Sequence, residues 1–77
     1  MIRVMSKHTR FTVEFERETD GRFIAEIQEL PGVLCYGKSR REAQTKAEAL
    51  ALRVVAERLE SGEQISRLAS VQFKLAV

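Results

Sequence analysis

Apart from carboxylates and hydroxyls, the candidates for a nucleophile or a general base are one histidine and one cysteine. His8 lies in a polar N-terminal segment, which predicts an ordinary surface residue. Cys35 follows Val33 and Leu34, so we expect a small buried side chain; a reactive thiolate needs nearby cations in an open site. One residue of each kind excludes an internal disulfide and metal sites built from several Cys or two His. The sequence therefore predicts no catalytic residues, no metal and no cofactor.

The carboxylates are more numerous, and many of them lie in one segment. Residues 14–29 carry six acidic and two basic side chains, whereas the whole chain has a net charge of +2. A two-metal nuclease needs several carboxylates that converge on the metal ions. Glu14 and Glu16 are expected on the strand face away from the core. Glu48 lies on the expected helix, and no inward-facing carboxylate is expected near it. The carboxylates therefore do not converge, and we expect no enzyme activity.

The functional hypothesis for this segment is an acidic surface that binds a basic partner. Its candidate residues are Glu14, Glu16, Asp20, Glu26 and Glu29. The alternative is a set of ordinary solvated faces, because clusters of like charge are usually surface features.

A basic group surrounds the start of the expected helix, at Lys38, Arg40, Arg41 and Lys46. Backbone N–H groups at a helix start also favour anions, so nucleic-acid binding through residues 38–46 is an alternative function. Only one aromatic residue, Tyr36, lies nearby to stack on a base. With 13 basic and 11 acidic residues, the chain is also too evenly charged for a dedicated nucleic-acid binder.

The length of 77 residues allows a single domain, 1–77, in which residues 1–8 are expected to form a mobile arm. No stretch approaches the ~20 apolar residues that cross a bilayer, so no membrane partner is expected. The N-terminus lacks the apolar region of a signal peptide, and the single cysteine agrees with a cytoplasmic location. Chains below ~80 residues have marginal cores, which favours self-association.

Alternating apolar and polar residues predict strands at 11–16, 22–28, 33–36 and 71–77. Turn residues separate the first three strands: Asp20-Gly21, then Leu30-Pro31-Gly32, with Gly37 closing the third strand. Ser39, three residues before Glu42, predicts a capping box at the start of a helix that ends at Ser61-Gly62.

These elements predict an α+β fold of order β-β-β-α-β. Tight turns make the first three strands an antiparallel meander, and a right-handed crossover through the helix places the last strand parallel to the first, in the spatial order 3-2-1-4. One helix then covers one sheet face and leaves the other open, polar except for Ile24. Leu52, Val55 and Leu59 form a helical stripe away from the sheet-facing side. These four apolar residues are the candidate interface of a homodimer or tetramer.

The segment Glu29-Leu30-Pro31-Gly32-Val33, followed by Tyr36-Gly37-Lys38-Ser39-Arg40-Arg41-Glu42-Ala43, resembles the HicB antitoxin family. The matching positions are Asp20-Gly21, Leu30-Pro31-Gly32, Gly37, the capping residue Ser39 and Glu42-Ala43, and the likeness covers about residues 11–60. The resemblance implies a partial ribonuclease H-like domain without nuclease activity.

The resemblance also implies a partner: a small basic RNA-cleaving toxin of the HicA type, whose active site the protein masks. Family members that bind operator DNA continue into a helix-turn-helix or ribbon-helix-helix domain. This chain ends after the fourth expected strand, so DNA binding is not expected. Residues 38–41 are basic where the family is usually acidic, so a toxin contact there is not expected either. Stand-alone members of this kind include orphans, which leaves a homo-oligomeric interaction protein as an alternative.

Overall fold

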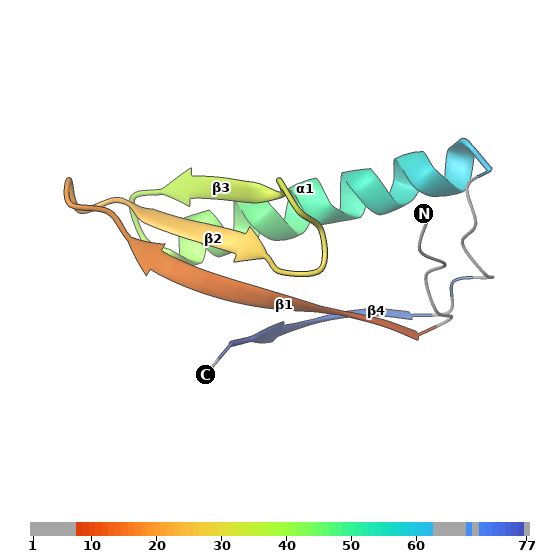
Figure 1. Ribbon diagram of the computed structural model, residues 1–77, viewed down its shortest axis with the longest axis horizontal. Coiled ribbons are helices and arrows are strands. Elements are labelled where there is room, and N and C mark those ends of the chain that lie inside the picture. The colour runs from red at the N-terminus through yellow and green to blue at the C-terminus, as the bar shows by residue number, and fades with distance from the viewer. Residues whose placement is uncertain (1–7, 63–67, 69, 77) are drawn as a thin grey trace.

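The structure is a computed structural model that describes residues 8–62, 68 and 70–76. The described residues form β1 (His8–Arg17), β2 (Phe23–Ile27), β3 (Leu34–Gly37), α1 (Arg40–Glu60) and β4 (Ser70–Leu75). The predicted β-β-β-α-β order is confirmed, with α1 lying along one side of the sheet (Figure 1). Residues 1–7 of the predicted arm lie outside the described residues. His8, predicted to belong to that arm, is instead the first residue of β1.

The sheet has the predicted spatial order, β3-β2-β1-β4. β2 pairs antiparallel with both β1 and β3, whereas β4 pairs in parallel with β1. A parallel pair needs a long crossover connection, and α1 supplies it by carrying the chain from β3 to the opposite edge of the sheet. The fold is therefore α+β with one mixed sheet and one helix.

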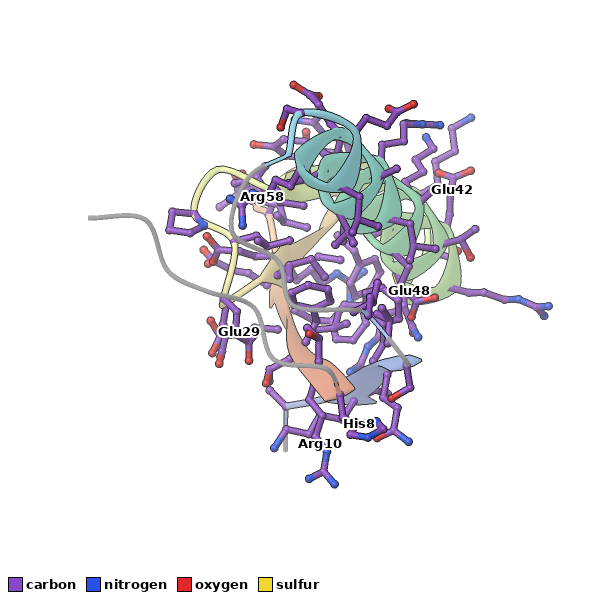
Figure 2. The ribbon with its side chains drawn as sticks, turned by 90° about the vertical axis from the view of Figure 1, so that its right-hand side faces the viewer. His8, Arg10, Glu29, Glu42, Glu48 and Arg58 are labelled. Carbon is purple, nitrogen blue, oxygen red and sulfur yellow. The ribbon has the colours of Figure 1, made fainter. Side chains whose placement is uncertain are left out.

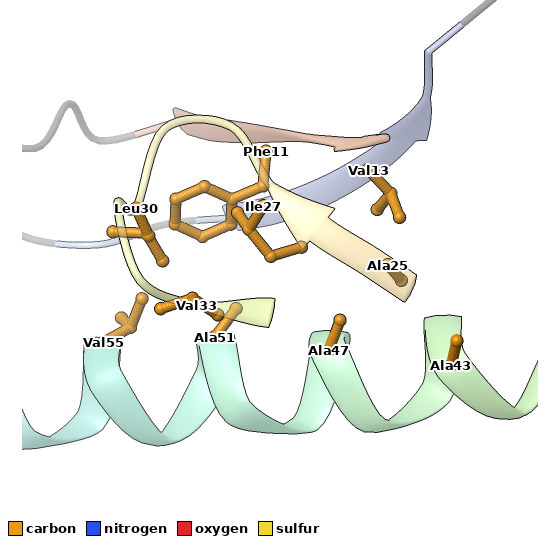
Figure 3. Packing of buried hydrophobic residues seen from close by; sticks show 10 residues of the cluster. All are labelled: Phe11, Val13, Ala25, Ile27, Leu30, Val33, Ala43, Ala47, Ala51 and Val55. Carbon is orange, nitrogen blue, oxygen red and sulfur yellow. The ribbon is translucent and has the colours of Figure 1, made fainter. Parts of the chain in front are cut away.

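The core lies between α1 and the inward face of the sheet. Ten buried apolar residues form it: Phe11, Val13, Ala25, Ile27, Leu30, Val33, Ala43, Ala47, Ala51 and Val55. The small alanine side chains allow α1 to pack closely on β2 and β3, as Figure 3 shows. Beyond the helix, Phe11 contacts Phe73 of β4, with ring centroids 5.6 Å apart. Burial of a side chain such as Phe11 contributes about 1.5–3 kcal/mol to stability.

The buried row of α1 includes Val55, which was expected in the stripe away from the sheet. The buried residues are Ala43, Ala47, Ala51 and Val55, each four positions after the last. Four residues advance ~400° around a helix, so this row winds slowly around α1 and its last member is Val55. Val55 is only 3% exposed and faces the core, so its prediction as part of an exposed interface stripe is wrong. Leu52 and Leu59 remain exposed, at 47% and 46%.

Glycines shape two of the predicted turns. Gly21 and Gly32 have φ angles of +92° and +87°, which side chains other than glycine rarely adopt. Between β2 and β3, Leu30 N donates to Ile27 O and Val33 N donates to Leu30 O, so the Leu30-Pro31-Gly32 segment is a tight turn. This turn buries Leu30 in the hydrophobic core and leaves Pro31 exposed.

Gly37 is needed for another reason, a close approach between β3 and the start of α1. A Cβ atom at this position would contact the backbone nitrogen of Ala43 and would lie 2.9 Å from its Cα atom. Because these are backbone atoms at the start of the helix, they cannot rotate away. The predicted structural role of Gly37 is therefore confirmed.

The start of α1 is capped as predicted by Ser39, whose hydroxyl accepts a hydrogen bond from Glu42 N at 3.1 Å. The reciprocal bond differs from the standard capping box. Glu42 accepts from the backbone N–H of Lys38 at 2.7 Å, one residue before the cap. At the other end Gly62 has a φ of +73°, as predicted for the residue that ends the helix. No helix in the described part of the chain is long and apolar enough to cross a membrane.

Candidate protein-binding surface

The sheet face opposite α1, here called the outer face, carries the candidate site. Residues paired directly across neighbouring strands share a sheet face. The register therefore arranges the outer side chains of β1, β2 and β3 in two rows. The first row is Glu14, Glu26 and Leu34, and the second is Glu16, Ile24 and Tyr36.

Three carboxylates in these rows, Glu14, Glu16 and Glu26, form an acidic patch. Within the described residues, none of the three carboxylates has a hydrogen-bonding or ion-pair partner. Glu14 and Glu26 lie directly opposite each other on β1 and β2. Like charges in this position destabilise a sheet by ~0.2–1 kcal/mol. A positive charge from another molecule would remove this repulsion, so the acidic patch favours a cationic ligand.

Glu29, another predicted binding residue, has a structural role. Its carboxylate accepts hydrogen bonds from the backbone N–H and the hydroxyl of Thr12, both at 2.7 Å. Partial burial raises the pKa of Glu29, but the two bonds from Thr12 outweigh this effect and the net pKa is lowered. Glu29 thus fixes the turn after β2 to the middle of β1.

Asp20 also has an internal partner, Arg22, at the tip of the β1–β2 hairpin. Its carboxylate accepts from Arg22 N at 3.0 Å and from Arg22 Nε at 2.7 Å. The backbone hydrogen bond is the main reason that the pKa of Asp20 is lowered. Of the five predicted acidic residues, the structure therefore brings three together as free carboxylates and engages two in turns.

Apolar side chains lie next to the acidic patch. Ile24 is half-buried, whereas Leu34 and Tyr36 on the edge strand β3 are 38% and 40% exposed. The Arg22 guanidinium stacks on the Tyr36 ring, 4.5 Å from its centroid, and holds that ring in place. A partner that pairs its cations with the carboxylates can also bury these apolar groups, which is the usual composition of a protein–protein interface.

The opposite end of the outer face is basic. Arg10 of β1 pairs with Gln72 of β4, and Lys74 pairs with Thr12. Arg10 and Lys74 line a shallow depression together with Gln72 and Phe73. Figure 2 shows the Arg10 side chain pointing away from α1. Along β1 itself, the outward side chains therefore change from basic Arg10 near its start to acidic Glu14 and Glu16 near its end.

The basic group at the start of α1 is partly engaged within the molecule. The Arg40 guanidinium lies over the Phe15 ring, 4.5 Å from the centroid. Lys46 is one helical turn after Glu42, and its Nζ atom lies 3.8 Å from Glu42 Oε1. The hydrogen bond from Lys38 N and then the charge of Lys46 lower the pKa of Glu42, so this carboxylate is ionised beside the helix start. An anionic nucleic acid would have to approach that negative charge.

The remaining candidates for a nucleophile, a general base or a metal ligand lie on separate elements. His8 Nδ1 lies 2.9 Å from Ser70 Oγ on β4, whereas Cys35 is half-buried on the inward side of β3. Glu48 accepts a hydrogen bond from Gln44 at 2.8 Å on the same helix. In the described part of the chain, no group of three or more His, Cys, Asp or Glu side chains is placed to hold a metal ion.

The predicted strands placed the acidic patch and Ile24 on the outer face but did not show four further residues there. Leu34, Tyr36, Arg10 and Lys74 became part of it only through strand pairing. The signal that could have placed Leu34 and Tyr36 was the predicted third strand, because alternation puts both on the face opposite Cys35. Arg10 lay outside the predicted first strand.

No family model matches the chain, and no curated protein or solved structure shows significant similarity to it.

Proposed function

We propose that the protein is a binding module of the HicB antitoxin type and that the acidic patch of its outer face binds a small, basic, RNA-cleaving toxin of the HicA type. The observation that carries the proposal is the direct opposition of Glu14 and Glu26, with Glu16 beside them and no cation of the described chain paired to any of the three. Two facing carboxylates without an internal partner are best explained by a partner that supplies the positive charge.

The neighbouring apolar residues support a protein as the partner. Leu34 and Tyr36 lie beside the acidic patch, on the edge strand β3. The aliphatic stems of a partner's Lys and Arg side chains can lie on these two residues while their charged ends reach the carboxylates. The resemblance to the HicB family supplies the identity of that partner. Its motif residues Gly32, Gly37 and Ser39 take part here in the turn, the close approach and the cap that hold α1 against the sheet.

In this proposal the protein has no enzymatic activity of its own and acts in the cytoplasm, where its partner would cleave RNA. The protein would inhibit the toxin by covering basic residues that bind RNA, so its carboxylates take the place of phosphates. Such an interface associates quickly at low salt and weakens as salt screens the charges.

The test is a calorimetric titration of the purified chain with a HicA-type protein encoded in the same genome. The variant Glu14→Gln/Glu26→Gln should bind at least ~10-fold more weakly than the wild type, because two interfacial charges are lost. The matched control is Glu57→Gln/Glu60→Gln, which removes the same charge from exposed positions of α1. Equal affinity of the two variants, or no binding by the wild type, would contradict the proposal.

A further inference from the structure

The outer edge of β4 is the part of the sheet that the other described elements leave open. β4 is the last strand on its side of the sheet, next to β1, whereas α1 packs on β2 and β3 (Figure 1). The other edge strand, β3, has four residues and lies against α1, whereas β4 has six. An open strand of this length presents backbone N–H and C=O groups that can pair with another extended chain.

The pairing of β4 with β1 identifies which backbone groups face this edge. Ala76 N donates a hydrogen bond to Val13 O of β1 at 2.8 Å. Successive residues of a strand direct their N–H and C=O groups to opposite sides, so the groups of Gln72 and Lys74 also face β1. The residues that direct their backbone groups to the open edge are therefore Val71, Phe73 and Leu75.

The same three residues form an apolar row on the inward side of β4. Phe73 and Leu75 pair with Phe11 and Val13 of the core, so their side chains share the face that α1 covers farther along the sheet. Val71 and Phe73 are only half-buried, and Leu75 is 49% exposed. Apolar side chains of an added strand would cover this row, so the edge combines backbone pairing with hydrophobic contact.

On its outward side the same edge is basic. Gln72 and Lys74 share this side with Arg10 of β1, and these residues line the shallow depression. Glu29 also faces this group, but from the other side of Thr12, to which its carboxylate is bonded. Two cations and one engaged carboxylate favour an acidic side chain at the outward positions of an added strand.

We propose that β4 binds an extended acidic segment of another protein, which adds to the sheet as an antiparallel strand. Antiparallel pairing is slightly more stable per residue than parallel pairing. Apolar residues of the segment lie opposite Phe73 and Leu75, and alternate with acidic residues beside Lys74. No acidic residue is expected beside Ala76, because Glu14 of β1 follows Val13 at that end of the pairing.

The charges favour such a segment over a second copy of this chain. Antiparallel pairing of two β4 strands would continue one sheet, so Arg10 and Lys74 of both copies would lie on the same face. This inference goes beyond the proposed function and does not depend on it. The toxin is proposed to bind carboxylates of β1 and β2, whereas the segment pairs with the edge of β4.

The test uses a blocked synthetic peptide of alternating valine and glutamate residues, long enough to pair with all of β4. It is titrated into the isotopically labelled full chain up to ~2 mM, and we expect a Kd of ~1 mM or below. Without peptide, the amides of Val71, Phe73 and Leu75 should exchange quickly with solvent, whereas those of Gln72 and Lys74 should exchange slowly. With ~2 mM peptide, the exchange of the first three should slow at least ~3-fold.

Two modified peptides test the backbone pairing directly. In the antiparallel arrangement the valine N–H groups face β4, so N-methylation of the valines should weaken binding at least ~10-fold. The glutamate N–H groups face away from β4, so their N-methylation should change the affinity less than ~3-fold. Equal affinity of the two methylated peptides would overturn the inference.

Matched variants test the charges. Arg10→Gln/Lys74→Gln should weaken binding at least ~5-fold. Arg41→Gln/Arg53→Gln removes the same charge from exposed positions of α1 and should leave the affinity unchanged. Circular dichroism checks that both variants are folded, and equal affinity of the two folded variants would contradict the proposal.

Three further results would overturn the inference. The first is the absence of shifts in the amide signals of β4 at ~2 mM peptide. The second is slow exchange of Val71, Phe73 and Leu75 in the chain alone, which would show that the edge is already covered. The third is a shift of these signals as the chain alone is concentrated, which would place a second copy at the edge.

Discussion

Replacement of Gly37 by alanine tests the contact that joins the sheet to the helix. The added Cβ atom would contact Ala43 N, and it would lie 2.9 Å from Ala43 Cα and 3.0 Å from the carbonyl carbon of Glu42. Ordinary contacts of this kind need about 3.4 Å or more. The first turn of α1 would have to move outward by several tenths of an ångström or more, and this would loosen the packing of Ala43 and Ala47 on the sheet.

Overpacking of this kind costs ~1–3 kcal/mol, and the displaced atoms here belong to the backbone, so we expect a loss of about 2–3 kcal/mol. In a chain of this size, 1 kcal/mol corresponds to ~4–8 °C in Tm, so the Gly37→Ala variant should melt roughly 10–20 °C below the wild type. Thermal unfolding followed by circular dichroism measures this shift. All variants should be compared at one protein concentration, because self-association raises the apparent stability.

Gly32→Ala is the matched control. Gly32 has a φ of +87° but open space around its Cα atom, so alanine there introduces backbone strain of about 1–2 kcal/mol without a collision. Gly37→Ala should therefore be the more damaging of the two substitutions. A Gly37→Ala variant that melts at or above the Tm of Gly32→Ala would refute the close approach of β3 and α1.

Further predictions concern Glu29, Ser39, Pro31 and Leu52. The pKa of Glu29 is lower in the folded chain than its ordinary value of 4.5, so its bonds to Thr12 stabilise the protein above about pH 4.5, and this contribution is lost as the pH falls through the folded pKa. The stability difference between wild type and Glu29→Gln in urea titrations should therefore shrink on acidification; a difference that stays constant from pH 7 to 3 would contradict the role of this carboxylate. Ser39→Ala removes the cap of α1 and should cost about 1 kcal/mol in urea unfolding, while Ser39→Asp should restore most of it. Pro31→Ala should cost ~1 kcal/mol or less and leave partner binding intact, because Pro31 is an exposed turn residue; selective loss of binding by a folded variant would make the turn part of the interface. Leu52→Glu should leave association of the chain unchanged if copies meet through the outer face, whereas a monomeric variant would place the contact on α1.

The order and direction of the elements could be predicted from the sequence because each depends on a local signal. Alternation between Phe11 and Phe15 marks the first strand, and the glycine and proline turns limit how the next two strands can pair. The handedness of crossover connections then leaves one position for the last strand. The full length of β1 was not predictable in this way, because its N-terminal half is a strand through pairing with β4, more than 60 residues later in the chain.

The candidate site was predicted only in part, because strand periodicity shows which residues share a sheet face but not which contacts a turn makes. Strand periodicity placed Glu14, Glu16 and Glu26 on the face opposite the core, and the structure places them there. Periodicity could not show that Glu29 turns back to bond Thr12, because the conformation of a turn decides that contact. It also misplaced Val55, because the angle at which α1 crosses the sheet determines which helical residues are buried.

Binding of a toxin through the outer face is tested most directly by a nuclear magnetic resonance titration of the isotopically labelled chain with a HicA-type protein. We expect the amide signals of Glu14, Glu16, Ile24 and Glu26 to shift or broaden when one equivalent of the partner is added. The amide signal of Arg53, an exposed helix residue, should not shift. Shifts confined to α1, or no shifts at all, would contradict the assignment of the outer face as the binding surface.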